Sequence, residues 1–432
     1  MLARRTMTDR LLALLILALL TACSQGSVPD PAIPTSSPTP APTSVTLLLW
    51  HGWSGSERMA LGRLVERYNR EYPAGRISLQ SVPLAAFAGD MRVAADAGSG
   101  PHMALIPNSW VGDLALAGAL LPLDEELPAD DLAQLLPVSV AGARAAAADG
   151  PPRLYGVPIS FDTLALFYNT ANVLSPPEDS ATLFERARGL GAPQAATPIW
   201  GLALNLSLDN TLGYLYAFGG RIFDDEGQLV LGTSGRSGTE QWLTWLQSLQ
   251  SDPLLLTRTE SSVMVDRELR NGRALMTFDW AHRYDLYRNL WGDNLGVAPL
   301  PHLSETNTAP RAYVRSDLLV LNSRIGSAER AAAIRFLRYM LTDEAQAVLL
   351  AGNLQPVLQT LPLDGTDIRL AAARAFRLQA EQGLPMPNFA QRALIEQELK
   401  LMQRQVLSGL ATPADAVSDT ERRLRERLIA AP

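Results

Sequence analysis

Short apolar strands alternate with amphipathic helices along this chain from residue 45 onward. Residues 45–50 are apolar except for Thr46 and predict a buried strand, and residues 57–72 carry apolar side chains at helical spacing. Further strands are predicted at residues 77–82 and 103–106, with helices at 87–97 and 110–117. Alternation of this kind favours an α/β fold in which a mostly parallel sheet is covered by helices on both faces.

The same pattern continues in a second region that begins near residue 155. It predicts strands at residues 164–168, 200–206, 273–278 and 311–321, helices at 182–190, 212–218, 238–250, 328–341 (capped by Ser327) and 343–351, and a largely helical tail at 388–428. A length of 432 residues predicts two domains, and 47% hydrophobic residues suit large cores. The net charge of −7 argues against a nucleic-acid partner.

The N-terminus has the pattern of an export signal. Basic residues at Arg4, Arg5 and Arg10 precede an apolar run at 11–20, which is half of the roughly 20 residues that a membrane-spanning helix needs. We therefore expect residues 1–22 to be a signal peptide. Cys23 ends a Leu-Thr-Ala-Cys sequence that resembles a bacterial lipobox, which implies lipidation of Cys23; the alternative is an ordinary cleaved signal with an incidental cysteine.

A linker rich in Pro, Ser and Thr follows at residues 23–44. In a polyproline-like conformation it extends by about 3 Å per residue, so it could hold a domain tens of Å from a membrane. The expected location is extracytoplasmic, with lipidated Cys23 anchoring the chain to the bacterial membrane.

Motifs for catalysis or metal binding are weak. The sequence at residues 52–56 is one glycine short of a G-x-S-x-G nucleophile elbow around Ser54, and the four histidines (His51, His102, His282 and His302) have no motif around them. Residues 224–227 lack the alternating ligands of a calcium loop, and a solvated turn is the better interpretation. We expect no catalytic residue, no metal and no cofactor, and a surface hydrolase using Ser54 remains a minor alternative.

Aromatic residues gather where predicted strands meet helices. Examples are Trp53, Trp110, Tyr214, Trp280 and Tyr313. Ligands of parallel α/β sheets bind at the carboxyl ends of strands, and an aromatic face with nearby polar side chains matches the apolar face and hydroxyl rim of a sugar. The set therefore favours a polar, ring-shaped ligand.

Five stretches of the chain resemble the extracellular solute-binding proteins of ABC sugar importers. They are Leu49-Trp50-His51-Gly52-Trp53; Gly100-Pro101 with Gly118-Ala119-Leu120; Tyr155-Gly156-Val157-Pro158 with Phe167-Tyr168-Asn169; Gly272-Arg273-Ala274-Leu275-Met276; and Met386-Pro387-Asn388 with Leu407-Ser408-Gly409. The resemblance implies a type II periplasmic-binding-protein fold of two α/β lobes joined by a hinge that the chain crosses more than once. It assigns residues 45–157 and 308–356 to the first lobe, and 158–307 and 357–432 to the second.

The ligand is expected between the lobes. The expected ligand-binding residues are His51, Trp53, Ser54, Asn108, Ser109, Trp110, Asp162, Asp209, Asn210, Tyr214, Trp280, Arg283 and Tyr313. Trp53, Trp110 and Trp280 are expected to stack on a sugar, while carboxylates and amides bind its hydroxyls. Two positions depart from the maltose-binding members of the family: Glu396 stands where they have a stacking tryptophan, and Ile106 replaces another tryptophan.

The expected partners are a mono- or oligosaccharide and the transmembrane subunits of an ABC permease, with the chain a monomer. A non-sugar solute, such as a glycerol phosphodiester, a polyamine or an iron chelate, remains an alternative, because Arg283, Arg311 and Arg315 could bind phosphate. A role as a sensor without a transporter also remains open.

Overall fold

The computed structural model describes residues 44–97, 100–146, 151–224, 227–258, 263–389 and 391–430. The expected signal peptide, the expected lipidation site at Cys23, nearly all of the linker, and half of the 224–227 turn lie outside the described residues. None of the helices in the described part of the chain is both long and apolar enough to span a bilayer.

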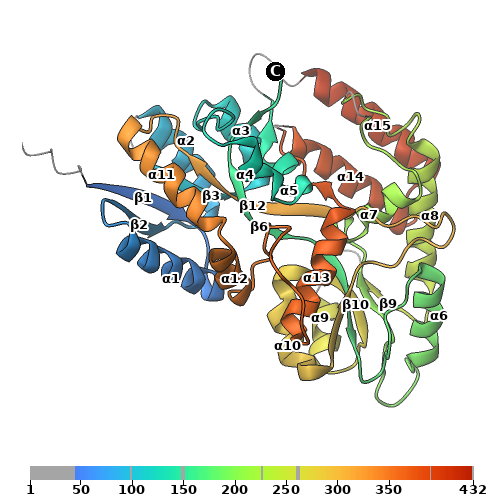
Figure 1. The fold of residues 1–432 in the computed structure, drawn as a ribbon. Helices are drawn as coiled ribbons and strands as arrows, with labels where there is room; N and C mark the ends of the chain where they lie inside the picture. Colours follow the sequence, from blue (N-terminus) through green and yellow to red (C-terminus); the bar gives the residue numbers. More distant parts are fainter. Residues whose placement is uncertain are drawn as a thin grey trace, which may run out of the picture. The chain divides into compact units, whose positions relative to one another are not determined.

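Strands and helices alternate through most of the described chain (Figure 1). The strands are β1 (Val45–His51), β2 (Gly75–Ser81), β3 (Met103–Pro107), β4 (Arg144–Ala145), β5 (Arg153–Leu154), β6 (Val157–Asp162), β7 (Leu164–Asn169), β8 (Ala203–Asn205), β9 (Leu256–Arg258), β10 (Met276–Trp280), β11 (Leu295–Ala298), β12 (Tyr313–Leu321) and β13 (Leu384–Pro385).

The α-helices are α1 (Gly55–Glu71), α2 (Leu84–Asp96), α3 (Val111–Leu116), α4 (Ala129–Ala133), α5 (Pro137–Gly142), α6 (Ser180–Leu190), α7 (Leu208–Ala217), α8 (Arg236–Ser251), α9 (Val263–Arg270), α10 (Tyr284–Trp291), α11 (Ser327–Met340), α12 (Asp343–Ala351), α13 (Ile368–Glu381), α14 (Arg392–Leu407) and α15 (Pro413–Ala430). Short 3₁₀ helices are η1 (Asn108–Trp110), η2 (Ala281–Arg283) and η3 (Gly292–Asn294).

Side-chain caps fix the starts of several helices. The Asp179 carboxylate accepts a hydrogen bond from the Thr182 backbone N at 2.9 Å and so begins α6. Thr342 and Asp367 cap α12 and α13 in the same way. The predicted cap at Ser327 is wrong: Gly326 is the N-cap of α11, and Ser327 is the first helical residue.

The large sheet places the carboxyl ends of several strands at one edge. Within the described residues it has six strands in the order β13-β12-β3-β1-β2, with β6 also paired to β12. β1 runs parallel to β2 and β3, whereas β12 runs antiparallel to β3 and β6. The start of β12 therefore lies beside the ends of β3 and β6, with Asp317 opposite Pro107 and Arg315 opposite Asp162.

The small sheet has the order β10-β7-β11, and both of its pairings are antiparallel. The expectation of mostly parallel strands thus holds around β1 and for β8 with β9, but not around β7. The reason is the connection: Thr163 alone separates β6 from β7, so the chain runs directly from the large sheet into the small one. It returns between Ala298 and Tyr313.

Helices cover both faces of the large sheet, so nearly every residue of β3 and β6 is buried. On one face Tyr68 of α1 meets Phe336 of α11 with ring centroids 4.9 Å apart. On the other, Phe87 of α2 meets Trp50 of β1 at 6.1 Å. Phe167 of β7 extends this core into the small sheet, where it packs on Phe376 of α13.

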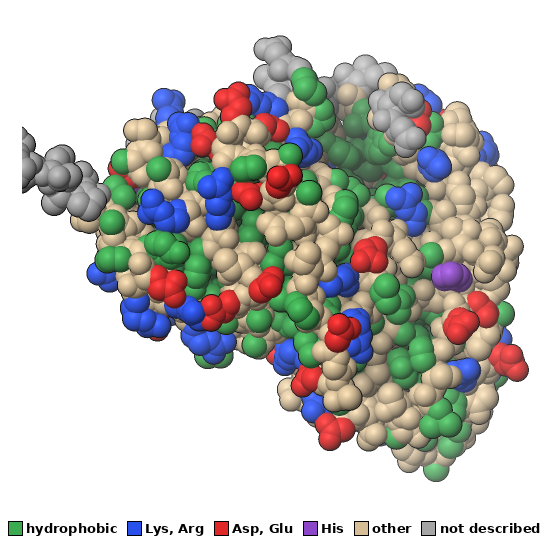
Figure 2. Space-filling model, in the orientation of Figure 1, with side chains coloured by type: hydrophobic (Ala, Val, Ile, Leu, Met, Phe, Trp, Pro, Cys, Tyr) green, Lys and Arg blue, Asp and Glu red, His purple; other side chains and the backbone are tan. Residues whose placement is uncertain are grey.

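A second core lies between α7, α8, α14 and α15, and the last three helices run side by side in Figure 1. Trp242 of α8 is fully buried there, and its indole donates to the Thr211 carbonyl at 3.1 Å. Figure 2 shows basic and acidic side chains interspersed over the visible surface, so charges on that face largely compensate one another.

Candidate functional site

Two cavities lie near the edge where the strands of the large sheet end. The first, called here the β1 cavity, has a volume of about 320 Å³ and is lined by side chains from the β1–α1 turn, β6, η2, β12 and the segment after α12. The second, the α14 cavity, has about 310 Å³ and is lined by α7, the 219–223 loop, the start of β12 and α14. Both contain residues that the sequence pattern predicts as ligand contacts.

The turn after β1 supplies one wall of the β1 cavity. Gly52 lies close to α2 there, because a Cβ at this position would be 2.6 Å from Leu84 Cδ2 and a larger residue would displace the Leu84 side chain. Trp53 and Ser54 line the cavity, and Ser54 begins α1 in an extended conformation. His51, in contrast, is 2% exposed beneath this wall, and burial lowers its pKa.

A half-buried carboxylate lines the β1 cavity beside this turn. Asp317 of β12 accepts a hydrogen bond from the Ser160 hydroxyl at 2.9 Å and another from the Trp53 indole. Burial raises the pKa of Asp317 to about 7, and the charges of Glu57 and Asp162 add to the effect. Burial also raises the pKa of Glu57, so the cavity contains carboxylates that readily hold a proton.

Asp162 ends β6 at the same cavity and is bonded to η2. The backbone N of His282 donates to Oδ1 of Asp162 at 3.1 Å, and His282 Nδ1 lies 2.9 Å from Oδ2. Asn353 adds a hydrogen bond from its side-chain amide to the His282 carbonyl at 2.8 Å. The carboxylate predicted to bind a ligand is therefore also a link between the two sheets.

Trp280, at the end of β10, is nearly buried and lines neither cavity, and its ring is covered by Arg315, which lines the β1 cavity. Its indole N–H donates to Oδ1 of Asn210 at 3.2 Å, which fixes the ring against α7. The guanidinium carbon of Arg315 lies 3.6 Å from the centre of the Trp280 ring, and Arg315 Nη2 is 3.2 Å from Oδ2 of Asp209. Of the predicted pair, Asn210 therefore fixes the Trp280 ring, and Asp209 fixes the arginine that covers this ring.

The α14 cavity combines aromatic and charged side chains. Tyr216 and Tyr313 lie on it with their hydroxyls 3.5 Å apart, and burial raises the pKa of both phenols. Glu396 lines the cavity and pairs with Arg392 at 2.6 Å. A carboxylate therefore occupies the wall where the sequence comparison expects a stacking side chain in maltose-binding relatives.

Within the described ranges, no group of three or more His, Cys, Asp or Glu side chains is arranged to hold a metal ion. Both cavities have apolar and aromatic walls with charged and hydrogen-bonding side chains among them. This arrangement suits the binding of a polar solute.

Comparison with known proteins decides the family. The family model described as "Bacterial extracellular solute-binding protein" matches residues 63–370, which is more than half of the chain. The chain belongs to this family. The location of this solute-binding protein is accordingly extracytoplasmic, and its family is one of binding proteins and not of enzymes.

One curated relative of this solute-binding protein is the maltotriose-binding protein of Pyrococcus abyssi, which is 25% identical over 301 residues. The match spans 69% of this chain and 62% of the relative, so the chain covers about three fifths of the relative's length.

Solved structures show the fold. A cyclo/maltodextrin-binding protein complexed with maltotetraose superposes with a TM-score of 0.75 at 18% identity, covering 91% of this chain and 99% of that one. A cyclic alpha-maltosyl-1,6-maltose binding protein from Arthrobacter globiformis gives 0.73 at 20% identity, covering 88% and 97%. The maltotriose binding protein of Thermus thermophilus gives 0.69 at 20%, covering 88% and 100%. The predicted α/β two-lobe fold is confirmed by these likenesses.

Several predicted contacts of this solute-binding protein lie away from the two cavities. Tyr214 is 1% exposed in the second core, where its hydroxyl donates to the Pro301 carbonyl at 3.0 Å. Asn108 is 1% exposed and donates to the Met386 carbonyl at 3.0 Å. Arg283 is paired with Asp266 and Asp279 at 2.7 and 3.0 Å. Each has a structural partner in place of an open position for a ligand.

Ser109 and Trp110 also lie outside both cavities, because η1 directs them to a neighbouring pocket of about 250 Å³. That pocket shares Phe389 and Arg392 with the α14 cavity, so Trp110 is near the predicted site without facing it.

The sequence pattern misses Glu57, His282 and Asp317 as cavity residues. Asp317 leaves a signal: it is a carboxylate within the otherwise apolar second half of the predicted strand at 311–321. Glu57 lies on the first turn of α1, where an acidic residue also fits the helix dipole, so its position alone does not indicate a site. His282 becomes recognisable only when η2 packs against β6.

Proposed function

We propose that this solute-binding protein captures a carbohydrate in the β1 and α14 cavities and delivers it to the permease of an ABC importer. The observation that carries the proposal is the Trp280 platform, whose ring is fixed by Asn210 and covered by Arg315, the ion-pair partner of Asp209. An aromatic ring flanked by hydrogen-bonding groups suits the apolar face and hydroxyl rim of a sugar. The relatives named for maltooligosaccharides support the choice of ligand class.

Within this proposal, the β1 cavity supplies a second set of contacts. Trp53 offers an indole, and Asp162 and Asp317 offer carboxylate oxygens that accept hydroxyl hydrogens. At the α14 cavity, Tyr216 and Tyr313 offer hydroxyls, while Glu396 offers charge where a stacking ring is absent. We infer that the ligand meets α14 through polar contacts.

A phosphate-bearing solute is the second candidate. Arg311 lines the α14 cavity and Arg315 lines the β1 cavity, and guanidinium groups bind phosphate through paired hydrogen bonds. Arg283 does not add to this cluster, since both of its ion pairs lie within the protein, and Arg315 would have to leave Asp209 before it could bind phosphate.

A thermal-shift screen of the purified mature protein tests the ligand class. A ligand that binds only the folded state raises the melting temperature, and the panel holds mono-, di- and oligosaccharides, glycerol phosphodiesters and polyamines. A shift with one family of sugars supports the proposal. Shifts confined to phosphodiesters or polyamines would replace carbohydrate by the corresponding solute class.

We also propose that Cys23 carries a lipid that anchors the protein, since the cysteine ends a lipobox-like sequence and precedes a proline-rich linker. Detergent phase partitioning of the exported protein tests this: the wild type is expected in the detergent phase and Cys23→Ser in the aqueous phase. Equal partitioning of the two would remove the anchor from the proposal.

A further inference from the structure

The aromatic face of Trp280 is covered by a side chain of the protein itself. The guanidinium carbon of Arg315 lies 3.6 Å from the ring centre, within the range of a cation–π contact. Asp209 holds the same guanidinium at 3.2 Å. Arg315 is therefore fixed over the ring by two partners on two different elements, β10 and α7.

Arg315 also lies at the boundary between the two cavities. It lines the β1 cavity, while its ion-pair partner Asp209 lines the α14 cavity. Trp280 is 6% exposed and is absent from the lining residues of both cavities. The Arg315 guanidinium therefore lies over the Trp280 ring, between residues of the β1 cavity and Asp209 of the α14 cavity.

This position follows from the strand register. Arg315 is opposite Asp162 in the β12–β6 pairing, at the point where β6 ends and the chain leaves the large sheet. Its backbone is held by the sheet, whereas its side chain crosses from β12 to reach β10 and α7. A sugar ring stacking on the covered face of Trp280 would occupy the same space as the guanidinium.

We propose that Arg315 is a specificity-determining residue that competes with the ligand for the face of Trp280. A ligand that stays in the β1 cavity binds with Arg315 in place, whereas a ligand that extends across Trp280 into the α14 cavity must first displace the guanidinium. Arg315 therefore discriminates against long ligands. This inference rests on the proposed carbohydrate function.

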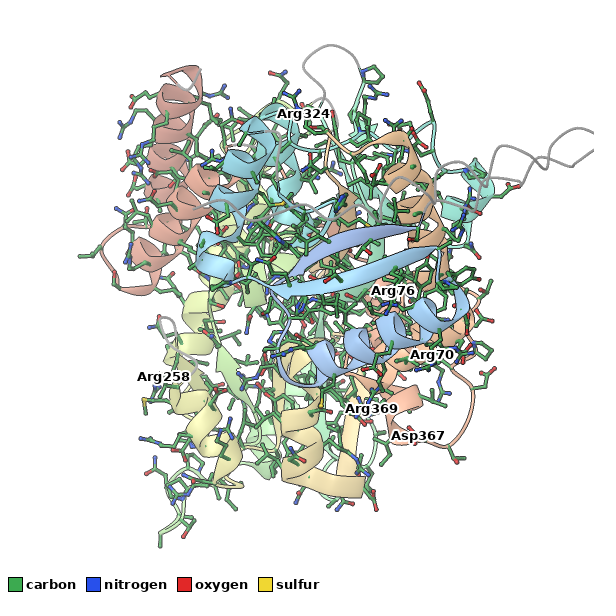
Figure 3. All side chains as sticks on the ribbon, turned by 90° about the vertical axis from the view of Figure 1, so that its left-hand side faces the viewer. Arg70, Arg76, Arg258, Arg324, Asp367 and Arg369 are labelled. Carbon is green, nitrogen blue, oxygen red and sulfur yellow. The ribbon has the colours of Figure 1, made fainter. Side chains whose placement is uncertain are left out.

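Calorimetric titration of wild type and Arg315→Ala with glucose and with maltotetraose tests the competition. Losing a cation–π contact of ordinary strength should tighten maltotetraose binding by about two- to thirtyfold, and this gain should exceed any change in glucose affinity. Arg315→Lys should fall between the two proteins, because lysine keeps the charge but lacks the planar group that stacks on indole. Arg324→Ala, an exposed arginine beyond the end of β12 (labelled in Figure 3), is the matched control and should leave both affinities unchanged.

The same comparison in a protein that lacks the Trp280 ring shows whether the ligand and Arg315 compete for that ring. In Trp280→Ala, the gain from Arg315→Ala should disappear, because no ring remains for the ligand and the guanidinium to share. If Arg315→Ala weakens maltotetraose binding, or tightens it equally with and without Trp280, the competition is overturned.

A measurement without ligand separates this inference from the proposed function. Acrylamide should quench tryptophan fluorescence more strongly in Arg315→Ala than in wild type, and the increase should vanish when Trp280 is replaced by Phe. No increase would overturn the claim that Arg315 covers the ring. If wild type binds no sugar at all, the carbohydrate function fails, and the quenching result still decides whether Arg315 shields the platform.

Discussion

His282 and Asp162 join the small and large sheets through two hydrogen bonds across the β1 cavity. The His282 backbone N and its Nδ1 atom approach the two carboxylate oxygens at 3.1 and 2.9 Å. Burial lowers the pKa of His282, but the hydrogen bond and charge of Asp162 act in the opposite direction, and the net pKa is raised. The folded protein therefore favours a protonated imidazole beside this carboxylate.

Stability should depend on pH through His282. Because its folded pKa is raised, the pair contributes fully below the unfolded pKa of about 6.5, and the contribution is lost as the pH rises through the folded value. The difference in unfolding free energy between wild type and His282→Gln should be largest in acid and shrink with rising pH. Urea unfolding across this range measures it, and a difference that grows with pH would contradict the assignment.

Asp317 should produce a second pH dependence in a lower range. Its pKa is raised to about 7, so between about pH 4 and that value the folded state holds a proton that the unfolded state has lost. Stability should therefore fall as the pH rises through this range, by at most about 4 kcal/mol.

The test for Asp317 compares urea unfolding of wild type and Asp317→Asn, in which the slope should flatten and stability near neutral pH should increase. Glu305→Gln, an exposed carboxylate elsewhere, is the control and should keep the wild-type slope. An unchanged slope in Asp317→Asn would show that this carboxyl titrates at its ordinary value.

Trp280 should be an energetic anchor for the ligand. Its ring is fixed by Asn210, and truncation of a buried aromatic anchor costs about 2 kcal/mol or more in binding. Calorimetry with a sugar long enough to extend across Trp280, such as maltotetraose, should show this loss in Trp280→Ala and a smaller one in Trp280→Phe. Trp245→Ala, in the packing around Tyr214, controls for loss of a tryptophan outside the cavities; equal affinity of Trp280→Ala and wild type would remove Trp280 from the site.

Local sequence patterns predict most of the α/β framework. The mostly apolar segment at 45–50 forms β1, and the apolar residues at helical spacing in 57–72 lie in α1. In both cases the side chains buried in the core repeat with the period of the element that forms. The pattern does not predict β11, α9, α10 or α13. Short strands such as β11, with four residues, carry too little periodicity, while α13 is alanine-rich and is defined by its packing on β7 and β11.

The candidate site is only partly readable from the sequence. Trp53 and Ser54 follow a predicted strand, whereas Asp162 is expected only from the family resemblance, and the structure brings all three to one cavity. The contact of Arg315 with Trp280 joins residues on two different sheets, so it depends on how those sheets pack and not on either local sequence. Tyr214 illustrates the opposite case, since its place near a strand–helix junction does not distinguish a core aromatic residue from a ligand platform.

Tyr214 should therefore act on stability and not on binding. Its buried hydroxyl donates to the Pro301 carbonyl at 3.0 Å, and burial raises the pKa of the phenol well above its ordinary value. Tyr214→Phe leaves that carbonyl without its partner and should lower the unfolding free energy by about 1–2 kcal/mol, while ligand affinity stays within about twofold of wild type. Chemical unfolding and calorimetry on the same samples measure both quantities. A large loss of affinity with unchanged stability would instead indicate that Tyr214 contacts the ligand, because removing a purely structural hydrogen bond should lower stability.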